Sequence, residues 1–417
     1  MKKAVKIFLV MLYIAVLSAA ALIVYYDLRL PDKYYVTKGG TLEFENNISI
    51  MAAVSTAEAE DIQTGFSQTE AEGIKSARLK LFGIFPIKTV DICEVEAAAV
   101  IPCGIPFGIK MVTDGVIVVD VNSFESGGAL VSPASEAGIR PGDIIVSISG
   151  KDMTCNEDIS SAVAESGGRT VGVRIIREGT ESVVFMKPEQ SSSDSVYRAG
   201  MWVRDSSAGI GTMTMYDPST GCFAGLGHPV CDIDTGELLP LSSGESAEVV
   251  ISGVKKGESG KPGELIGAFV SDKPSGQLLM NCKEGIFGVL ENAPCFTTAV
   301  PVAMRQEICT GEAVIYSTVK GCAPEAYTVE IERIDLTGDD NCRNMVIKIT
   351  DDRLTELSGG IVQGMSGSPI IQNGRLVGAV THVFVNDPLK GYAIFADSMY
   401  EKMNEAGKLK DISDIAA

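Results

Sequence analysis

Short stretches of alternating apolar and polar residues dominate the sequence from about residue 200 to residue 400, and they constrain the fold more than any other feature. Examples are "EAVIYSTV", "AYTVEIERID" and "MVIKITD", with Gly, Pro or Asp between such stretches. A period of two is typical of strands, and the 44 glycines in 417 residues fit many short turns. We therefore expect a mainly β chain. Residues 200–407 should form a barrel or sandwich with a short helix over "SMYEKMNEAG", followed by a frayed tail at 408–417.

An apolar run without charges, from Ile7 to Tyr26, lies at the N-terminus. Its 20 residues would span a hydrocarbon core as a helix, and the lysines of "MKKAVK" would stay on the cytoplasmic side. We expect residues 1–26 to be a transmembrane anchor. The small residues of "SAAA" leave a cleaved signal peptide as the alternative. Both interpretations export the rest of the chain, which then faces outward.

The composition excludes one class of partner and leaves others open. The net charge is −19 and no basic run follows the N-terminus, so a phosphate backbone would be repelled and we expect no nucleic-acid partner. The ten cysteines form no compact framework, which favours small buried side chains over disulfides. We expect neither a cofactor nor a metal.

Residues 98–188 contain the sharpest local pattern. The strand "GVIVVDV" is followed by the helix, turn and strand of "SPASEAGIRPGDIIVSISGKDM" and by the amphipathic helix "NEDISSAVAES". "AGIRPGDIIVSISGK" resembles a PDZ domain, in the order usual for bacterial protease-associated ones. The resemblance implies a groove beside helix 156–166 in which an extended peptide adds as a strand. The carboxylate-binding loop would lie in "IPCGIPFGIKM", with backbone N–H groups from Phe107, Gly108 and Ile109. A PDZ fold used only for internal packing is the alternative.

The segments on either side of this unit are less informative. Residues 27–97 form an extracytoplasmic linker region, with a strand in "YYVTKGGTLEF" and one or two in "IKSARLKLFGIFPIKTVDICEV". We expect any self-cleavage position to lie there. The serine-rich, polar segment 189–199 is interpreted as a linker to the C-terminal domain.

A possible nucleophile lies in "GGIVQGMSGSPIIQNGRLVGAV", where Ser366 stands between glycines. A serine hydroxyl attacks a carbonyl only when a base takes its proton and donors hold the oxyanion. Glycines let the chain turn so that backbone N–H groups point inward, and the N–H groups of Gly364 and Ser366 are the expected oxyanion hole. The Asn373-Gly374 pair predicts a hairpin that holds the turn rigid. Ser368 is the rival nucleophile.

"GMSGSPI" followed by "NGRLVGAV" resembles the nucleophile turn of chymotrypsin-like peptidases, whose pattern is Gly-Asp-Ser-Gly-Gly-Pro. Met365 replaces the usual polar residue, and Ser368 replaces the second glycine. A closer resemblance covers most of the chain. "GIGTMTMYDP", "GLGHPVCDIDTG", "GIVQGMSGSPIIQNG" and "VGAVTHVFVNDPLKGYAIF" resemble the stage IV sporulation protein B family of endospore-forming bacteria. That family has a membrane segment, a PDZ domain and a C-terminal serine peptidase domain in this order.

Only two histidines are available as a base. His382 lies within the apolar strand "VGAVTHVFV", where a histidine is more often a core group. His228 lies in "AGLGHPVCD", between a strand and a loop, and we expect it to be the general base. The resemblance supports this choice, because the family's catalytic histidine falls in the motif matching "LGHPV".

The acid that orients the histidine has several candidates. Asp232 and Asp234 are close to His228, but a residue four places away in a loop rarely returns with the right geometry. The resemblance places the family's aspartate at Asp351, with Asp352 in reserve. The order His228, Asp351, Ser366 is that of chymotrypsin-like enzymes, although the aspartate lies unusually near the serine.

The resemblance also implies a biological role. Such proteins act in the space between the two forespore membranes, cleave themselves, and cleave a membrane-bound regulator of an intramembrane protease. This cleavage activates a late mother-cell sigma factor. The alternatives are a PDZ scaffold without catalysis and a general envelope quality-control protease. A zinc site of Cys222, His228, Cys231 and His382 fits no common motif.

Overall fold

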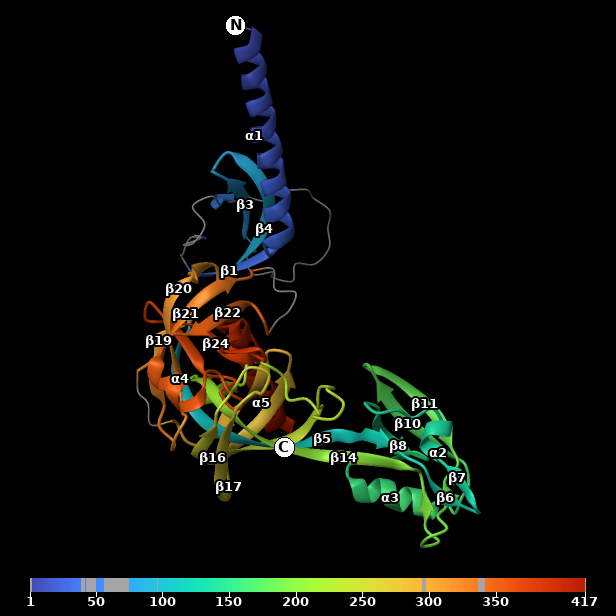
Figure 1. Ribbon diagram of the computed structural model, residues 1–417. Helices are drawn as coiled ribbons and strands as arrows, with labels where there is room; N and C mark the ends of the chain where they lie inside the picture. The colour runs from blue at the N-terminus through green and yellow to red at the C-terminus, as the bar shows by residue number, and fades with distance from the viewer. Residues whose placement is uncertain are drawn as a thin grey trace.

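The structure, a computed structural model, describes residues 2–38, 42, 50–55, 75–95, 97–294, 298–336 and 342–416. Three bodies follow the N-terminal helix in Figure 1: a small sheet beside it, a double-barrel body, and a lobe joined to that body by two long strands. Parts of the predicted self-cleavage region, 39–41, 43–49 and 56–74, lie outside the described residues.

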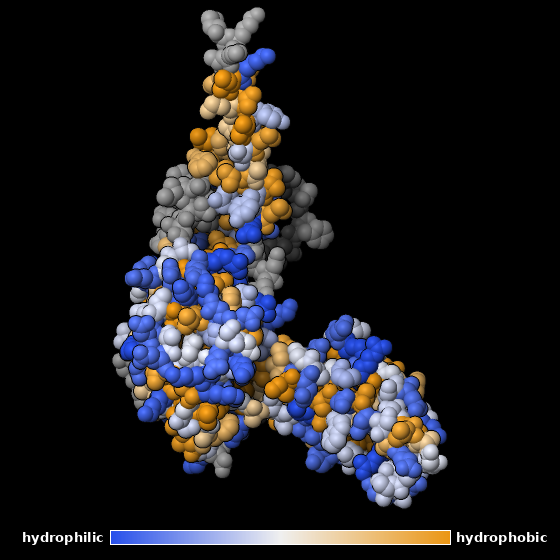
Figure 2. All heavy atoms as spheres, in the orientation of Figure 1, coloured by the Kyte–Doolittle hydropathy of each residue, from blue (hydrophilic) through white to orange (hydrophobic). Residues whose placement is uncertain are grey.

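The N-terminal helix is long and apolar. Residues Lys6–Arg29 have a mean hydropathy of 2.8, none of that segment is buried, and Figure 2 shows apolar side chains along it. Its length and composition are those of a membrane anchor or a signal sequence. The following region holds more strands than predicted, with the order β1-β4-β3-β2. These elements are α1 (Lys2–Arg29), β1 (Lys33–Thr37), β2 (Ile50–Ser55), β3 (Lys75–Leu81) and β4 (Phe85–Val95).

The first barrel closes through strands from two distant parts of the chain. Its pairings run β5-β14-β15-β18-β17-β16 and return from β16 to β5. Phe107, Phe223 and Leu278 are among its core residues. Its elements are β5 (Ala99–Val121), β14 (Met201–Tyr216), β15 (Cys222–Gly225), β16 (Leu241–Lys255), β17 (Glu264–Cys282) and β18 (Gly285–Leu290), with β19 (Val300–Pro301) pairing β5.

The PDZ lobe is an insertion into this barrel. The second half of β5 leads into it and the first half of β14 leads out, and the two halves pair with each other, as at Val118 and Val203. The lobe has its own core, which includes Ile145, Ile159 and Val173. Its elements are β6 (Phe124–Ser126), β7 (Ala129–Val131), α2 (Pro133–Glu136), β8 (Ile144–Ile148), β9 (Lys151–Asp152), α3 (Asn156–Glu165), β10 (Val171–Arg177), β11 (Thr180–Met186), β12 (Glu189–Gln190) and β13 (Tyr197–Arg198).

The second barrel is closed in the order β20-β21-β22-β25-β24-β23, as expected for a chymotrypsin-like domain. Alternation is regular in β21, where Tyr327, Val329 and Ile331 are buried and their neighbours exposed. The Asn373-Gly374 hairpin is confirmed, with both residues at positive φ. The elements are η1 (Arg305–Glu307), β20 (Gly311–Ser317), β21 (Glu325–Ile334), β22 (Met345–Ile349), α4 (Asp352–Ser358), β23 (Pro369–Gln372), β24 (Arg375–Phe384), β25 (Asp387–Phe395) and α5 (Ala396–Ala416).

Two expectations about the chain's organisation need correction. Residues 99–112, predicted as part of the PDZ domain, belong to the first barrel, because β5 pairs with β14 from Ile101 onward and with β16 from Phe107 onward. The predicted tail at 408–417 is not frayed as far as Ala416, since α5 continues through it. Met399 and Met403 of this helix are fully buried in a core that also contains Phe287 of the first barrel and Ala379 of the second.

The barrels meet at the turn that follows α4. Thr212 of β14 donates its N–H to the Ser366 carbonyl at 3.0 Å and its hydroxyl to the Gly364 carbonyl at 2.7 Å. Thr214 donates its buried hydroxyl to the Gly367 carbonyl at 2.7 Å. A Cβ on Gly367 would lie 1.9 Å from the Thr212 carbonyl oxygen. Only glycine therefore permits this approach.

Gly367→Ala should lower the free energy of unfolding by about 3 kcal/mol or more, because it adds a clash to left-handed backbone strain at φ +97°. Gly374→Ala is the matched control, with φ +74° and nothing within 4 Å of a Cβ, and should cost only about 1 kcal/mol. Denaturant unfolding of the detergent-solubilised protein measures both. Equal losses would show that the two barrels do not depend on this contact.

Candidate active site

A cavity of about 860 Å³ lies where the two barrels meet, and Ser366 and both histidines line it. Ile210, Leu226 and His228 come from the first barrel, whereas Gly364, Ser366, Thr381 and His382 come from the second. A Cβ on Gly227 would lie 3.0 Å from the Thr381 side chain, so the loop that carries His228 packs directly on the second barrel. The structure thus brings the predicted nucleophile and the predicted base to one cavity.

The turn around Ser366 is held by backbone hydrogen bonds on both sides of the serine. Met365 donates to the Val362 carbonyl at 3.1 Å, and Gly367 donates to the Val380 carbonyl at 2.7 Å. Gly364 and Gly367 have φ of +95° and +97°, which glycine adopts without strain. Met365 is fully buried in the core of the second barrel, which explains an apolar residue where the chymotrypsin pattern has a polar one.

Two N–H groups of this turn are candidates for an oxyanion hole. Among the backbone hydrogen bonds of the described residues, none uses the N–H of Gly364 or of Ser366, whereas Met365, Gly367 and Ser368 all donate. Both residues line the cavity. These two donors are therefore available to a substrate oxygen that becomes negatively charged.

The Ser366 hydroxyl donates to the Thr381 carbonyl at 2.6 Å. It is therefore directed at β24 rather than at an imidazole, and it must rotate about its side-chain bond before a histidine can take its proton. The rival Ser368 has no exposed surface and donates to the Ser317 hydroxyl at 3.0 Å. That burial removes Ser368 as a nucleophile for a substrate.

His228 follows β15 in a loop that turns at Leu226 and Gly227, both at positive φ. Its Nδ1 lies 2.8 Å from the Pro229 carbonyl oxygen. Because a carbonyl only accepts, this contact fits the tautomer with the proton on Nδ1 and a free lone pair on Nε2. Burial lowers the pKa of His228 from 6.5, opposed by the Pro229 carbonyl. The imidazole is thus neutral at pH 7, as a base must be.

His382 does not lie in the core as expected. Its ring lies 4.9 Å from the His228 ring, centroid to centroid and tilted by 39°, and both rings line the cavity. His382 is half-buried, and the pairing of β24 with β25 shifts register between Val380 and Val383, so regular alternation is interrupted at this position. The apolar flanks of "VGAVTHVFV" hid this, because they give both faces of the strand the same character.

Asp351 is not brought to either histidine. It lies outside the residues that line the cavity and caps the N-terminus of α4. Its carboxylate accepts from the Arg353 N–H at 2.9 Å, from the Arg353 guanidinium and from the Thr328 N–H. The Arg353 guanidinium, opposed by burial and helped by these backbone donors, lowers the pKa of Asp351. The neighbouring Asp352 is the first residue of the same helix.

The two aspartates nearest His228 in sequence are also engaged elsewhere. Asp232 accepts from the Thr235 N–H at 2.9 Å and from the guanidinium of Arg204, which also donates to Asp234 at 2.7 Å. Burial raises the pKa of Asp232, but the hydrogen bonds from Thr235 and Asp234 and the charge of Arg204 together lower it. Arg204, which sequence reasoning missed, also lines the cavity.

The predicted carboxylate-binding loop of the PDZ domain is placed wrongly. Phe107, Gly108 and Ile109 lie in the middle of β5, paired with β14 on one side and β16 on the other. Phe107 is buried against Phe223, with ring centroids 5.6 Å apart. A strand paired on both sides has no N–H groups to offer a peptide. The sequence "IPFGIKM" matched the expected composition but belongs to a barrel strand.

Potential metal ligands do not gather in the part of the chain that the structure describes, where no three His, Cys, Asp or Glu side chains form a site. Cys222, one of the four residues weighed for zinc, is buried in the core shared with α5.

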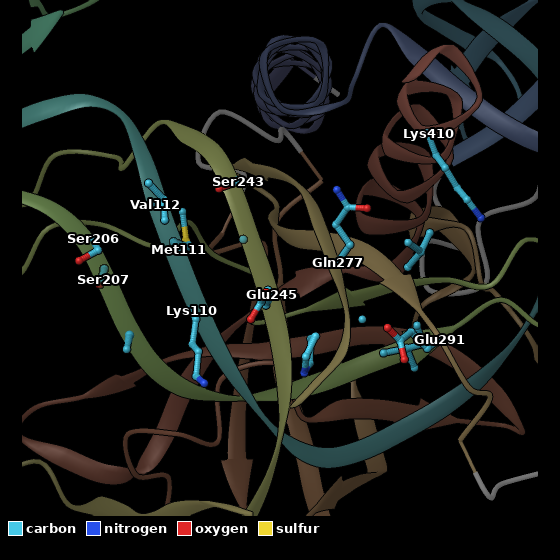
Figure 3. Close-up of a pocket in the computed structure, with 16 residues that line it drawn as sticks. Lys110, Met111, Val112, Ser206, Ser207, Ser243, Glu245, Gln277, Glu291 and Lys410 are labelled. Carbon is cyan, nitrogen blue, oxygen red and sulfur yellow. The ribbon is translucent and has the colours of Figure 1, made fainter. Parts of the chain in front are cut away.

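A second cavity of about 920 Å³ opens on the first barrel (Figure 3). Strands β5, β14, β16, β17 and β18 line it, together with Lys410 of α5. Lys110 and Glu245, labelled in the figure, are paired across neighbouring strands. The lining contains serines but neither histidine.

Two protein-family models match parts of this chain. A model of the family described as SpoIVB peptidase S55 matches residues 195–400, and a PDZ domain model matches residues 130–177. Serine protease HTRA1 of Xenopus tropicalis is 44% identical over 52 residues, which are 12% of this chain and 11% of that protein; HTRA1 of Xenopus laevis is 42% identical over 52 residues, again 12% and 11%.

Among solved structures, the Rv3671c protease from M. tuberculosis in its active form is 17% identical, with a TM-score of 0.27, over 48% of this chain and 75% of that one. The PDZ domain of the SdrC-like protein from Listeria monocytogenes is 19% identical, with a TM-score of 0.18, over 22% and 87%. With the peptidase model matching residues 195–400 and the PDZ model matching residues 130–177, the chain belongs to the SpoIVB-type peptidases that carry a PDZ domain.

Proposed function

We propose that this protein is a serine endopeptidase in which Ser366 is the nucleophile and His228 the general base. The observation that carries the proposal is the cavity between the barrels, which Ser366, His228 and the free N–H group of Gly364 share. Ser366 and Gly364 lie on the second barrel and His228 on the first, so the site depends on both.

In the proposed reaction, Nε2 of His228 takes the Ser366 proton as Oγ attacks the peptide carbonyl. The oxyanion is held by the N–H groups of Gly364 and Ser366. The imidazolium then gives its proton to the leaving amine, and water repeats the sequence to release the acyl group. An approaching substrate would also free Ser366, because the Thr381 carbonyl that now accepts its hydroxyl can accept a peptide N–H instead.

The proposed base also needs a group that orients its imidazole. The Pro229 carbonyl holds Nδ1 of His228 and can keep the proton on that nitrogen. For Asp351 to act as the predicted acid, its carboxylate would have to leave Arg353 and the cap of α4. We therefore propose that the carbonyl of Pro229 orients the resting imidazole, with Asp351 reaching it only after a rearrangement.

The proposed substrates are proteins. Between Met201 and Arg204, β14 pairs with β5 on one side and with no other described strand, and α3 packs beside it. A peptide strand could add at this edge. By family membership we propose that the substrates are the protein itself and a membrane-bound regulator of an intramembrane protease in sporulation signalling. The enzyme would then work outside the cytoplasm, between the two forespore membranes, anchored by α1.

A PDZ scaffold without catalysis is the competing function. It is favoured by the Ser366 hydroxyl facing Thr381 and by the engagement of Asp351 with Arg353. A general quality-control protease would instead cleave unfolded casein, whereas a signalling peptidase should not.

Labelling with a fluorophosphonate probe tests the nucleophile in the full-length protein. Wild type and Ser368→Ala should be labelled, and Ser366→Ala should not, because Ser366 lines the cavity beside His228 whereas Ser368 is fully buried against Ser317. In-gel fluorescence measures the outcome, and circular dichroism confirms that each variant is folded. Folded wild type without label would favour the scaffold.

The labelling rate should fall at acid pH with a midpoint below 6.5, because burial lowers the pKa of His228 and protonation removes the base. The rate is thus retained down to a lower pH than an exposed imidazole would allow. The pH profile of the labelling rate is measured from pH 4 to 9 by quenching the fluorophosphonate reaction at timed intervals. A midpoint above 6.5 would contradict a buried base.

Incubated alone, the wild-type protein should yield fragments that Ser366→Ala does not. N-terminal sequencing of the fragments should place the new ends within 27–97, the region expected from the sequence. Identical fragments from both proteins would point to a contaminating protease and against self-cleavage.

A further inference from the structure

Arg204 joins the strand shared with the PDZ lobe to the loop that carries His228. Its guanidinium donates to Asp232 through one nitrogen and to Asp234, at 2.7 Å, through the other. The Asp232 side chain is completely buried, whereas that of Asp234 is half exposed. A planar guanidinium can satisfy two carboxylates at once, which an ammonium group does less well.

The segment that Arg204 holds is a compact turn within the His228 loop. Asp232 organises the turn by accepting from the N–H groups of Asp234 and Thr235, and Cys231 bridges Leu238. On the barrel side, the Asn281 side-chain amide accepts from the Val230 N–H and donates to the Val230 carbonyl. The loop is therefore held at two points, by Asn281 of the barrel and by Arg204 of β14.

Arg204 lies at the junction between the barrel and the PDZ lobe. The pairing of β14 with β5 shifts register between Arg204 and Ser206. The adjacent Asp205 faces the other way and accepts from the Asn156 N–H at the start of α3, at 2.8 Å. Two consecutive residues thus bind the His228 loop and the helix beside the free strand edge.

A second contact joins the PDZ lobe to the same loop. A Cβ on Gly142, in the turn before β8, would lie 3.2 Å from a side-chain carbon of Glu237. The Asp114 N–H, in the β5 part of the junction, also donates to the Pro240 carbonyl at 3.1 Å. The His228 loop is consequently packed on the junction along its second half.

We propose that Arg204 is a positioning residue of the peptidase, which holds the His228 loop in place through Asp232 and Asp234 and makes the position of the base depend on the strand shared with the PDZ lobe. For its effect on catalysis, this inference rests on the proposed function. Arg204 acts through the loop and takes no part in proton transfer.

The test needs a readout of His228 that does not require catalysis. Diethyl pyrocarbonate modifies imidazoles, and the chain has only two, which peptide mass spectrometry distinguishes. The full-length protein in detergent is compared as wild type, Arg204→Gln, Arg204→Lys and Asp234→Asn. Arg174→Gln is the matched control, since it removes an arginine that pairs with Asp152 and Glu181 within the PDZ lobe. Asp234→Asn keeps the test available if Arg204→Gln does not fold, because Asp234 is half exposed.

We expect His228 to be modified several-fold faster in Arg204→Gln, and to a lesser degree in Arg204→Lys and Asp234→Asn, with Arg174→Gln like wild type. For fluorophosphonate labelling of Ser366, the inactivation rate constant should fall about tenfold or more in Arg204→Gln while the probe's binding constant is unchanged, because misplacement of a base affects the chemical step.

Unchanged His228 modification in folded Arg204→Gln and Asp234→Asn would overturn the inference, as would an equal increase in Arg174→Gln. A wild-type protein that takes no fluorophosphonate would overturn the proposed function alone, since the modification rates would still show whether Arg204 holds the loop. Faster modification of His228 with an unchanged rate of inactivation by the fluorophosphonate would show that Arg204 holds the loop but does not position the base, and would refute that part of the inference.

Discussion

The contact between Thr212 and the turn around Ser366 is the constraint on which the rest of the site depends. The two barrels are separate sheets that isolated bridges, such as Ile251 to Gly321, also connect, and a site between them needs a fixed distance across the boundary. Thr212 provides it with two hydrogen bonds to the turn, and Gly367 allows the approach by having no side chain. The same strand, β14, carries Arg204, so one strand makes hydrogen bonds to both the turn around Ser366 and the His228 loop.

Because the site is divided between two barrels, its two parts are held by different contacts. The Ser366 turn is held by its own hydrogen bonds and by the buried Met365. The His228 loop is held by the side chains of Asn281 and Arg204, by packing against Thr381, and by the backbone hydrogen bond from Asp114 to Pro240.

Local chemistry in the sequence predicted much of this architecture. Alternation, glycine turns and the Asn373-Gly374 pair predicted a β-rich second barrel, and "AGIRPGDIIVSISGK" predicted the PDZ lobe. Other features could not be predicted, because they depend on pairing between strands that are distant in the sequence. Phe107 lies in a strand that pairs across the whole PDZ insertion, so nothing near it in sequence distinguishes a barrel strand from a binding loop. The positions of the His382 and Asp351 side chains could not be predicted for a similar reason, because the face of a strand and the partner of a carboxylate depend on neighbours far along the chain.

The insertion of the lobe within one barrel also bears on the order in which the chain acquires structure. Ile109 of β5 pairs with Ser246 of β16, which lies far along the chain. Such long-range pairing forms slowly, because the loop between the two strands must close before their contacts can form. The PDZ lobe lies wholly between the two halves of its host and closes through contacts of much shorter range. Once folded, it brings Val118 and Val203 together and so sets the start of the β5–β14 ladder. The lobe can thereby act as an internal template, which shortens the search that the barrel must make.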